Sequence, residues 1–204
     1  MLNAFETLFP DAHCELNHET SFQLLVAVML SAQTTDVAVN KITPELFASF
    51  PDAAHLAKAE TSEIEQIIKR IGLYKTKAKN IKAMSQILLD QYNGQVPSTR
   101  EALIALPGVG RKTANVVLSV AFNEPAFAVD THVERVSKRL GLAQEKDNVT
   151  VVEKKVTDFF PIDTWNKLHH QMIFFGRYHC TAKKPNCSEC PLYDLCQYQH
   201  KDKK

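Results

Sequence analysis

Residues 106–122 read LPGVGRKTANVVLSVAF and predict a tight turn between two helices. Pro107 and Gly108 end the first helix, and Gly110 lets the backbone turn sharply into the second. The backbone N–H groups at the start of that second helix have no intrahelical partner, so the turn is a ready site for an anion. An ordinary helix–helix turn would explain the letters PGVG equally well.

Two cations directly follow this turn. Arg111 and Lys112 stand in the first turn of the second helix, where the helix dipole disfavours a cation by about 0.3–1 kcal/mol. A plain turn does not explain this placement, and we therefore expect an external anion to bind there. A lysine amine is a nucleophile only when deprotonated, and a helix N-terminus and neighbouring cations favour the neutral form. Lys112 has both neighbours.

A second basic link precedes the first. Residues 71–81, IGLYKTKAKNI, loosely repeat PGVGRKTANVV at 107–117, and six cations but no acid lie between Gln66 and Leu89. A run of like charges is most often a solvated face. Two basic hairpins favour instead a surface that binds a phosphate backbone without reading its sequence. The formal net charge of +1 adds nothing to this argument.

The rest of the chain indicates an all-α protein of about ten short helices, since hydrophobic residues recur with helical spacing and no run alternates like a strand. We expect helices over 61–70, 77–92 and 99–106, the last opened by a capping box at 98–101. The longest apolar run, Leu24–Leu30, is far shorter than the roughly 18 residues of a membrane span. No signal pattern opens the chain, so a cytoplasmic protein with reduced thiols and no membrane partner is expected.

Asp130 stands in the segment FAVDTHVERV, between an apolar run and a predicted helix over 131–140. Aspartate is a favoured N-cap worth about 1 kcal/mol, and capping alone could explain this residue. The sequence does not show whether Asp130 and Lys112 are close in space.

Four of the five cysteines lie within the last 25 residues. They are Cys180, Cys187, Cys190 and Cys196. In a reducing compartment such a cluster favours a metal over disulfides, and both tetrahedral zinc and a 4Fe-4S cluster suit four thiolates. Lys183 and Lys184 lie between the first two cysteines and could contact phosphates. Cys14 is expected to be an ordinary buried cysteine.

LPGVGRKTANVVL, followed by VDTHVERV and then by Cys-x6-Cys-x2-Cys-x5-Cys, resembles the endonuclease III family of helix-hairpin-helix DNA glycosylases. The resemblance covers essentially the whole chain, including LSAQTTD and GLYKTKAKNI. It implies a two-lobed all-α fold with a DNA cleft between the lobes. One lobe is a six-helix domain over 22–121, and the other is an iron-sulfur cluster domain over 1–21 and 122–204. It also implies a 4Fe-4S cofactor held by the four clustered cysteines.

The resemblance further implies a bifunctional DNA glycosylase and abasic-site lyase of base excision repair. Its partner would be duplex DNA containing damaged pyrimidines or abasic sites. The enzyme would excise oxidised or saturated pyrimidines and cleave the strand by β-elimination, acting as a nucleoid-associated monomer. Lys112 would attack the sugar C1′ and form a Schiff base, while Asp130 would activate that lysine or stabilise the positive charge on the sugar.

Further positions match DNA-contacting residues of the family. Gln33 and Leu73 would enter the duplex and fill the space left by the extruded nucleotide, a step that costs a few kcal/mol. Without the resemblance, Leu73 is an ordinary leucine and Gln33 a helix-end amide. The hairpin residues Gly108, Gly110 and Arg111 would hold phosphates.

Two alternatives remain open. An adenine glycosylase shares the hairpin, the aspartate and often the cluster, but lacks a lysine at the position of Lys112. A non-enzymatic helix-hairpin-helix module with structural zinc would bind DNA without cleaving it, and would be colourless.

Overall fold

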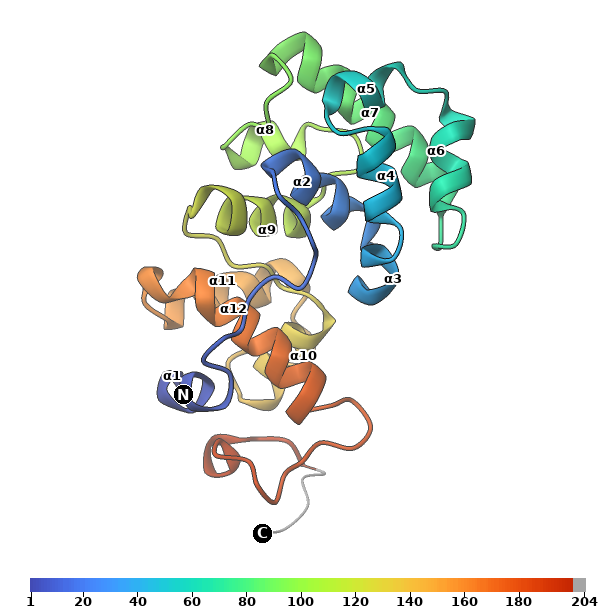
Figure 1. Ribbon diagram of the computed structural model, residues 1–204. Helices are drawn as coiled ribbons and strands as arrows, with labels where there is room; N and C mark the ends of the chain where they lie inside the picture. Colours follow the sequence, from blue (N-terminus) through green and yellow to red (C-terminus); the bar gives the residue numbers. More distant parts are fainter. Residues whose placement is uncertain (200–204) are drawn as a thin grey trace. The chain divides into compact units, whose positions relative to one another are not determined.

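Every regular element in the computed structural model is helical over residues 1–199, the part of the chain that the structure describes (Figure 1). Within that part there are twelve α-helices, where the sequence predicted about ten. Many are only five to eight residues long, because Pro, Gly and Asn turns interrupt the chain more often than hydrophobic spacing reveals. None of the described helices is long and apolar enough to cross a bilayer.

The chain divides into two compact units. One unit spans residues 15–123, and the other combines residues 1–14 with the chain from residue 124 onward. Residues 15–21 join the first unit because Asn40 holds them: its side chain accepts from the Asn17 backbone N–H at 2.9 Å and donates to the Glu15 carbonyl at 2.7 Å. The predicted domain limits at 21/22 and 121/122 stay a prediction.

The unit of residues 15–123 is built around one apolar helix. Its helices are α2 (Ser21–Leu30), α3 (Asp36–Asn40), α4 (Thr43–Ser49), α5 (Ala53–Lys58), α6 (Thr61–Ile68), α7 (Tyr74–Tyr92), α8 (Arg100–Ile104) and α9 (Arg111–Phe122). The resemblance implied six helices here; two of these eight segments, α3 and α8, have only five residues each. Nearly all of α2 is buried, and it packs against both α7 and α9 (Figure 1). This central place explains why its sequence is apolar on every side.

Two helix starts differ from prediction. α7 begins at Tyr74 rather than at residue 77, because Leu73 in a left-handed conformation serves as its N-cap. The capping box predicted at 98–101 is wrong. Thr99 is instead the N-cap of α8, and its hydroxyl accepts from the Ala102 N–H at 3.3 Å. A threonine caps as a serine does, and the backbone of Thr99 has the extended conformation that an N-cap needs.

The second unit combines the N-terminal helix with the chain from residue 124 onward. Its elements are α1 (Leu2–Leu8), α10 (Thr131–Arg139), α11 (Val149–Phe159), the 3₁₀ turn η1 (Ile162–Thr164), α12 (Trp165–Phe174), the π-helical turn η2 (Phe175–His179) and the 3₁₀ turn η3 (Tyr193–Leu195). Phe5 of α1 meets Phe175 edge to face with ring centroids 5.4 Å apart. Lys167 of α12 donates to Glu6 at 2.6 Å. The N-terminal helix thereby completes the core of this unit.

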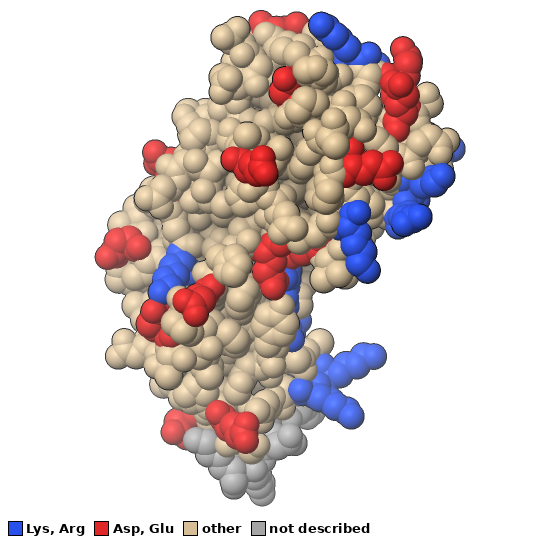
Figure 2. Space-filling model, in the orientation of Figure 1, with Lys and Arg blue, Asp and Glu red and all other residues tan. Residues whose placement is uncertain are grey.

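The surface carries both signs of charge. Figure 2 shows Asp and Glu side chains as well as Lys and Arg side chains on the face in view. This agrees with the formal net charge of +1. Any polyanion site therefore depends on local groups of residues and not on the overall charge.

Candidate functional site

The turn between α8 and α9 has the predicted hairpin form. Gly108 adopts φ 77°, and a Cβ there would lie 2.8 Å from the Asn80 side chain, so both conformation and space require glycine. Gly110 is different, because its φ is −92° and a Cβ would meet nothing within 4 Å. The expectation that Gly110 is needed for a sharp turn is therefore wrong. As the N-cap of α9 it leaves the first-turn N–H groups without a side-chain cap, which suits close approach by an anion.

Arg111 and Lys112 are both exposed in the first turn of α9, where the sequence predicted them. The following residues of α9, from Ala114 to Ser119, are buried. Arg100 of α8 donates from Nε to the Asn115 side chain at 3.0 Å and so joins the two hairpin helices. The lysine is therefore presented to solvent from a firmly held hairpin.

Gln33 and Leu73 share an unusual backbone conformation. Their φ angles are 54° and 59°, in the left-handed region, which costs a non-glycine residue roughly 1–2 kcal/mol. Both are exposed, and Leu73 leaves 56% of its surface accessible. A Cβ on Gly72 would lie 3.9 Å from the Gln33 carbonyl oxygen, so the two segments are neighbours although forty residues separate them in the chain. The packing of this unit does not account for an exposed leucine on a strained backbone.

Not every cation of the basic stretch between Gln66 and Leu89 lies on the surface. Its cations lie within the described part of the chain, and five of the six are exposed or half-buried. Lys77 is 6% exposed, and burial lowers its pKa. The expected basic face therefore has five of these six cations, because Lys77 is not part of it. Helical spacing back from Ile81, Met84 and Leu88 could have revealed that position 77 lies on the buried side of α7.

Asp130 is the N-cap of α10, as its local sequence predicted. Its Oδ1 accepts from the backbone N–H groups of His132 and Val133, both at 2.9 Å. Capping therefore engages one of the two carboxylate oxygens. Lys112 belongs to the unit of residues 15–123 and Asp130 to the other unit.

α10 packs closely on the segment that leads to the cysteines. A Cβ on Gly176 would lie 2.7 Å from the His132 Cβ, so only glycine fits between α10 and η2. Arg135 donates to the Gly176 carbonyl at 2.7 Å, and Arg139 donates to the Cys180 Sγ at 3.2 Å. Sequence reasoning missed both arginines, because nothing in the local pattern distinguishes them from solvated cations.

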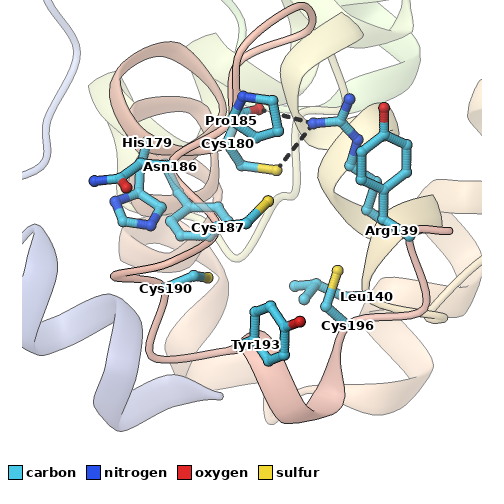
Figure 3. Close-up of a pocket in the computed structure, with 12 residues that line it drawn as sticks. Arg139, Leu140, His179, Cys180, Pro185, Asn186, Cys187, Cys190, Tyr193 and Cys196 are labelled. Carbon is cyan, nitrogen blue, oxygen red and sulfur yellow. Dashed lines mark hydrogen bonds between the residues drawn. The ribbon is translucent and has the colours of Figure 1, made fainter. Parts of the chain in front are cut away.

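The four clustered cysteines line the same cavity (Figure 3). They are Cys180, Cys187, Cys190 and Cys196. Apolar side chains such as Leu140 and Phe175 and polar side chains such as Arg139 and His179 also line it. Burial raises the pKa of the Cys180 and Cys190 thiols, which disfavours free thiolates in this cavity.

The side chains around this cavity suit a group that is held by sulfur. The structure brings four cysteines to one cavity, and four thiolates are the donor set of a 4Fe-4S cluster as well as of a structural zinc. His169 and His170 do not line the cavity, and burial lowers their pKa values to about 4 and about 2. Cys14 is half-buried instead of buried as expected.

Two family models match the chain. The model described as HhH-GPD superfamily base excision DNA repair protein matches residues 26–161. The chain belongs to the HhH-GPD superfamily. A second model, the iron-sulfur binding domain of endonuclease III, matches residues 180–196, which run from the first clustered cysteine to the last.

Within this superfamily, the chain is similar to endonuclease III. It is 52% identical to endonuclease III of Bacillus subtilis strain 168, covering all of this chain and 93% of the relative. It is 48% identical to endonuclease III of Escherichia coli strain K12, covering 94% of this chain and 90% of the relative. A solved structure of a trapped endonuclease III–DNA covalent intermediate superposes with a TM-score of 0.93 at 54% identity, covering 96% of this chain and 92% of the other.

These comparisons decide the fold class and the cofactor of this HhH-GPD protein. The two-lobed helix-hairpin-helix fold and the 4Fe-4S cluster implied by the sequence are confirmed. The zinc alternative is wrong, and so is the non-enzymatic alternative.

Proposed function

We propose that this protein acts on duplex DNA that contains oxidised or saturated pyrimidines or abasic sites, with Lys112 as its nucleophile. The protein is a bifunctional DNA glycosylase and abasic-site lyase of base excision repair. The observation that carries the assignment of Lys112 is its exposure in the first turn of α9, beside an N-terminus that no side chain caps. The proposed setting is the nucleoid in the cytoplasm, with the protein acting as a monomer.

In the proposed reaction the Lys112 amine attacks C1′ of the damaged nucleoside. A C–N bond forms as the bond from C1′ to the base breaks, and the base leaves with the electron pair and takes up a proton. Opening of the sugar ring converts the aminal into a Schiff base. Loss of a C2′ proton then expels the 3′ phosphate, which is the β-elimination that cuts the strand.

Asp130 supplies negative charge to this reaction. Its two capping hydrogen bonds fix the carboxylate at the start of α10, so the charge is held in place before the substrate arrives. A fixed carboxylate favours a transition state in which the sugar becomes positive, and it needs no reorganisation during the reaction. In this proposal the same side chain both caps the helix and takes part in catalysis.

Gln33 and Leu73 hold the opened duplex. Extruding a nucleotide costs a few kcal/mol in lost stacking and pairing, and a side chain that fills the vacated space offsets part of that cost. The exposed positions and strained backbones of the two residues support this role, since strain persists mainly where function requires it.

The four clustered cysteines hold the 4Fe-4S cluster in this proposal. When bound, the cluster joins four points of the C-terminal segment into one fixed loop. Arg139 supports the same loop, because it donates to the carbonyl oxygens of Thr181 and Ala182 at 2.8 and 3.1 Å. Lys183 and Lys184 are exposed on this loop and are proposed to contact phosphates.

Borohydride trapping on a duplex with a single thymine glycol tests the proposed substrate and the covalent chemistry together. We expect a covalent protein–DNA adduct with this duplex and with an abasic-site duplex, and none with the undamaged sequence. An adduct with the abasic duplex alone would leave the lyase in place and refute the substrate class. No adduct with either duplex would refute the role of Lys112 as well.

The double variant Lys183→Ala with Lys184→Ala should weaken binding to damaged and undamaged duplexes by similar factors. Each lost phosphate contact should flatten the slope of log Kobs against log salt by roughly one. The measurement is a binding titration over a series of salt concentrations. Lys154→Ala with Lys167→Ala, which removes two exposed lysines from α11 and α12, is a control of equal charge change. An unchanged slope in the loop variant would remove this loop from the interface.

A further inference from the structure

Lys77 contacts both of the segments that carry Gln33 and Leu73. Its backbone N–H donates to the Leu73 carbonyl at 3.0 Å, as part of the first turn of α7. Its buried Nζ donates to the Leu30 carbonyl at 2.8 Å and to the Thr34 hydroxyl at 2.9 Å. One residue therefore joins the start of α7 to the loop that follows α2.

The ammonium group is held by the two ends of this loop. Leu30 is the last residue of α2, where carbonyl groups lack intrahelical partners and the helix dipole favours a cation. The Thr34 hydroxyl in turn makes a long hydrogen bond of 3.4 Å to the Ala32 carbonyl. Ala32 and Thr34 are the immediate neighbours of Gln33, so the contacts of Lys77 bracket that residue.

Packing in the core of this unit does not by itself favour a lysine at position 77. Burying an ammonium group is costly unless hydrogen bonds satisfy it, and an unbranched apolar side chain of similar length would fill the space without that cost. Lys75 and Lys79 on the same helix are exposed, so this cost of burying an ammonium group does not arise for them. The lysine at position 77 is therefore explained by the polar groups of the loop that it binds.

We propose that Lys77 is a positioning residue that holds Gln33 beside Leu73, so that the two side chains enter the duplex together. This inference rests on the proposed function of those two residues. Lys77 acts through them and is too deeply buried to touch the DNA itself. Its loss should therefore impair opening of the duplex, and leave the attack by the amine and the binding of phosphates intact.

Single-turnover base removal by Lys77→Met, on two thymine glycol substrates, tests this inference. In one duplex the lesion is paired with adenine, and in the other it lies in a short mismatched bubble where pairing is already broken. We expect about a tenfold or larger loss of rate on the paired lesion and about threefold or less in the bubble, because extrusion costs least where a base is unpaired. Lys79→Met, which removes an exposed cation of the same helix, should instead change both rates by the same factor.

A second pair of variants covers the case in which Lys77→Met does not fold. Thr34→Val removes the hydroxyl that Nζ binds, and Thr34→Ser keeps it. We expect Thr34→Val to reduce the rate selectively on the paired lesion and Thr34→Ser to restore it. A 2-aminopurine opposite the lesion should brighten when the parent protein or Thr34→Ser binds, and much less with Thr34→Val, since its fluorescence reports unstacking.

The outcomes separate this inference from the proposed function. Equal losses on the paired and the bubble substrates would mean that Lys77 only stabilises the fold, and would overturn the inference. So would an unchanged rate on the paired lesion in Lys77→Met or Thr34→Val. If the parent protein itself removes thymine glycol from neither substrate, the proposed function fails instead.

Discussion

We expect the Lys112→Gln variant to fold and bind DNA as the parent protein does, but to lose borohydride trapping and strand cleavage. Lys112 is exposed and stands at the positive end of α9, where a cation is disfavoured by about 0.3–1 kcal/mol, so the fold should lose no stability. The open N-terminus of α9 and Arg111 remain to bind phosphate. An amide nitrogen is not a nucleophile, so no Schiff base can form. Trapping on an abasic-site duplex, beside a binding titration and a thermal melt, measures all three properties.

Arg111→Gln is the matched control for that substitution. It removes one exposed cation from the same helical turn, so binding should weaken and the salt slope should flatten by roughly one. At saturating protein it should still trap DNA, because the amine is intact. If Lys112→Gln still forms the borohydride adduct, another amine is the nucleophile and the role proposed for Lys112 is wrong.

We expect Asp130→Asn to melt close to the parent protein while base removal falls by two decades or more, about 2.7 kcal/mol of barrier. The amide oxygen of asparagine can accept the same two 2.9 Å hydrogen bonds from His132 and Val133, and asparagine caps nearly as well as aspartate. What the substitution removes is the negative charge that favours a cationic sugar. Single-turnover excision of thymine glycol, compared with the melting temperature, separates the two roles.

Asp130→Ala provides the complementary control. It removes both the cap and the charge, so it should lower stability by about 1 kcal/mol as well as lowering the rate. A full single-turnover rate in Asp130→Asn would show that the carboxylate is only a helix cap. If Asp130→Asn lowers the melting temperature as well as the rate, the rate loss follows from the weakened cap, and the carboxylate is again only a helix cap.

The sequence alone determined the features that depend on near neighbours in the chain. Helical spacing predicted α6 and most of α7, and the turn at Gly108 with the start of α9 followed from the local sequence. The cap at Asp130 was also predictable, because a cap is completed within three residues. The four cysteines predicted a metal group from their crowding, although the choice between zinc and iron-sulfur needed the family resemblance. The capping box predicted for α8 was wrong because Ser98 and Thr99 are both able to cap a helix. The backbone of Thr99 has the extended conformation of an N-cap, and α8 therefore begins after Thr99.

Tertiary packing decided the features that join distant residues. Helical spacing indicates that position 77 faces the buried side of α7, but only the packing of α7 against α2 brings its ammonium to Leu30, 47 residues away. The same packing places Gly72 beside Gln33 and so makes neighbours of two strained segments. At Gly110 the structure shows open space where the sequence suggested a conformational need. A local sequence pattern depends on interactions within about one turn of the chain. The hydrogen bonds that satisfy a buried charge depend instead on which helices meet around it, and these contacts form only when the whole unit has packed.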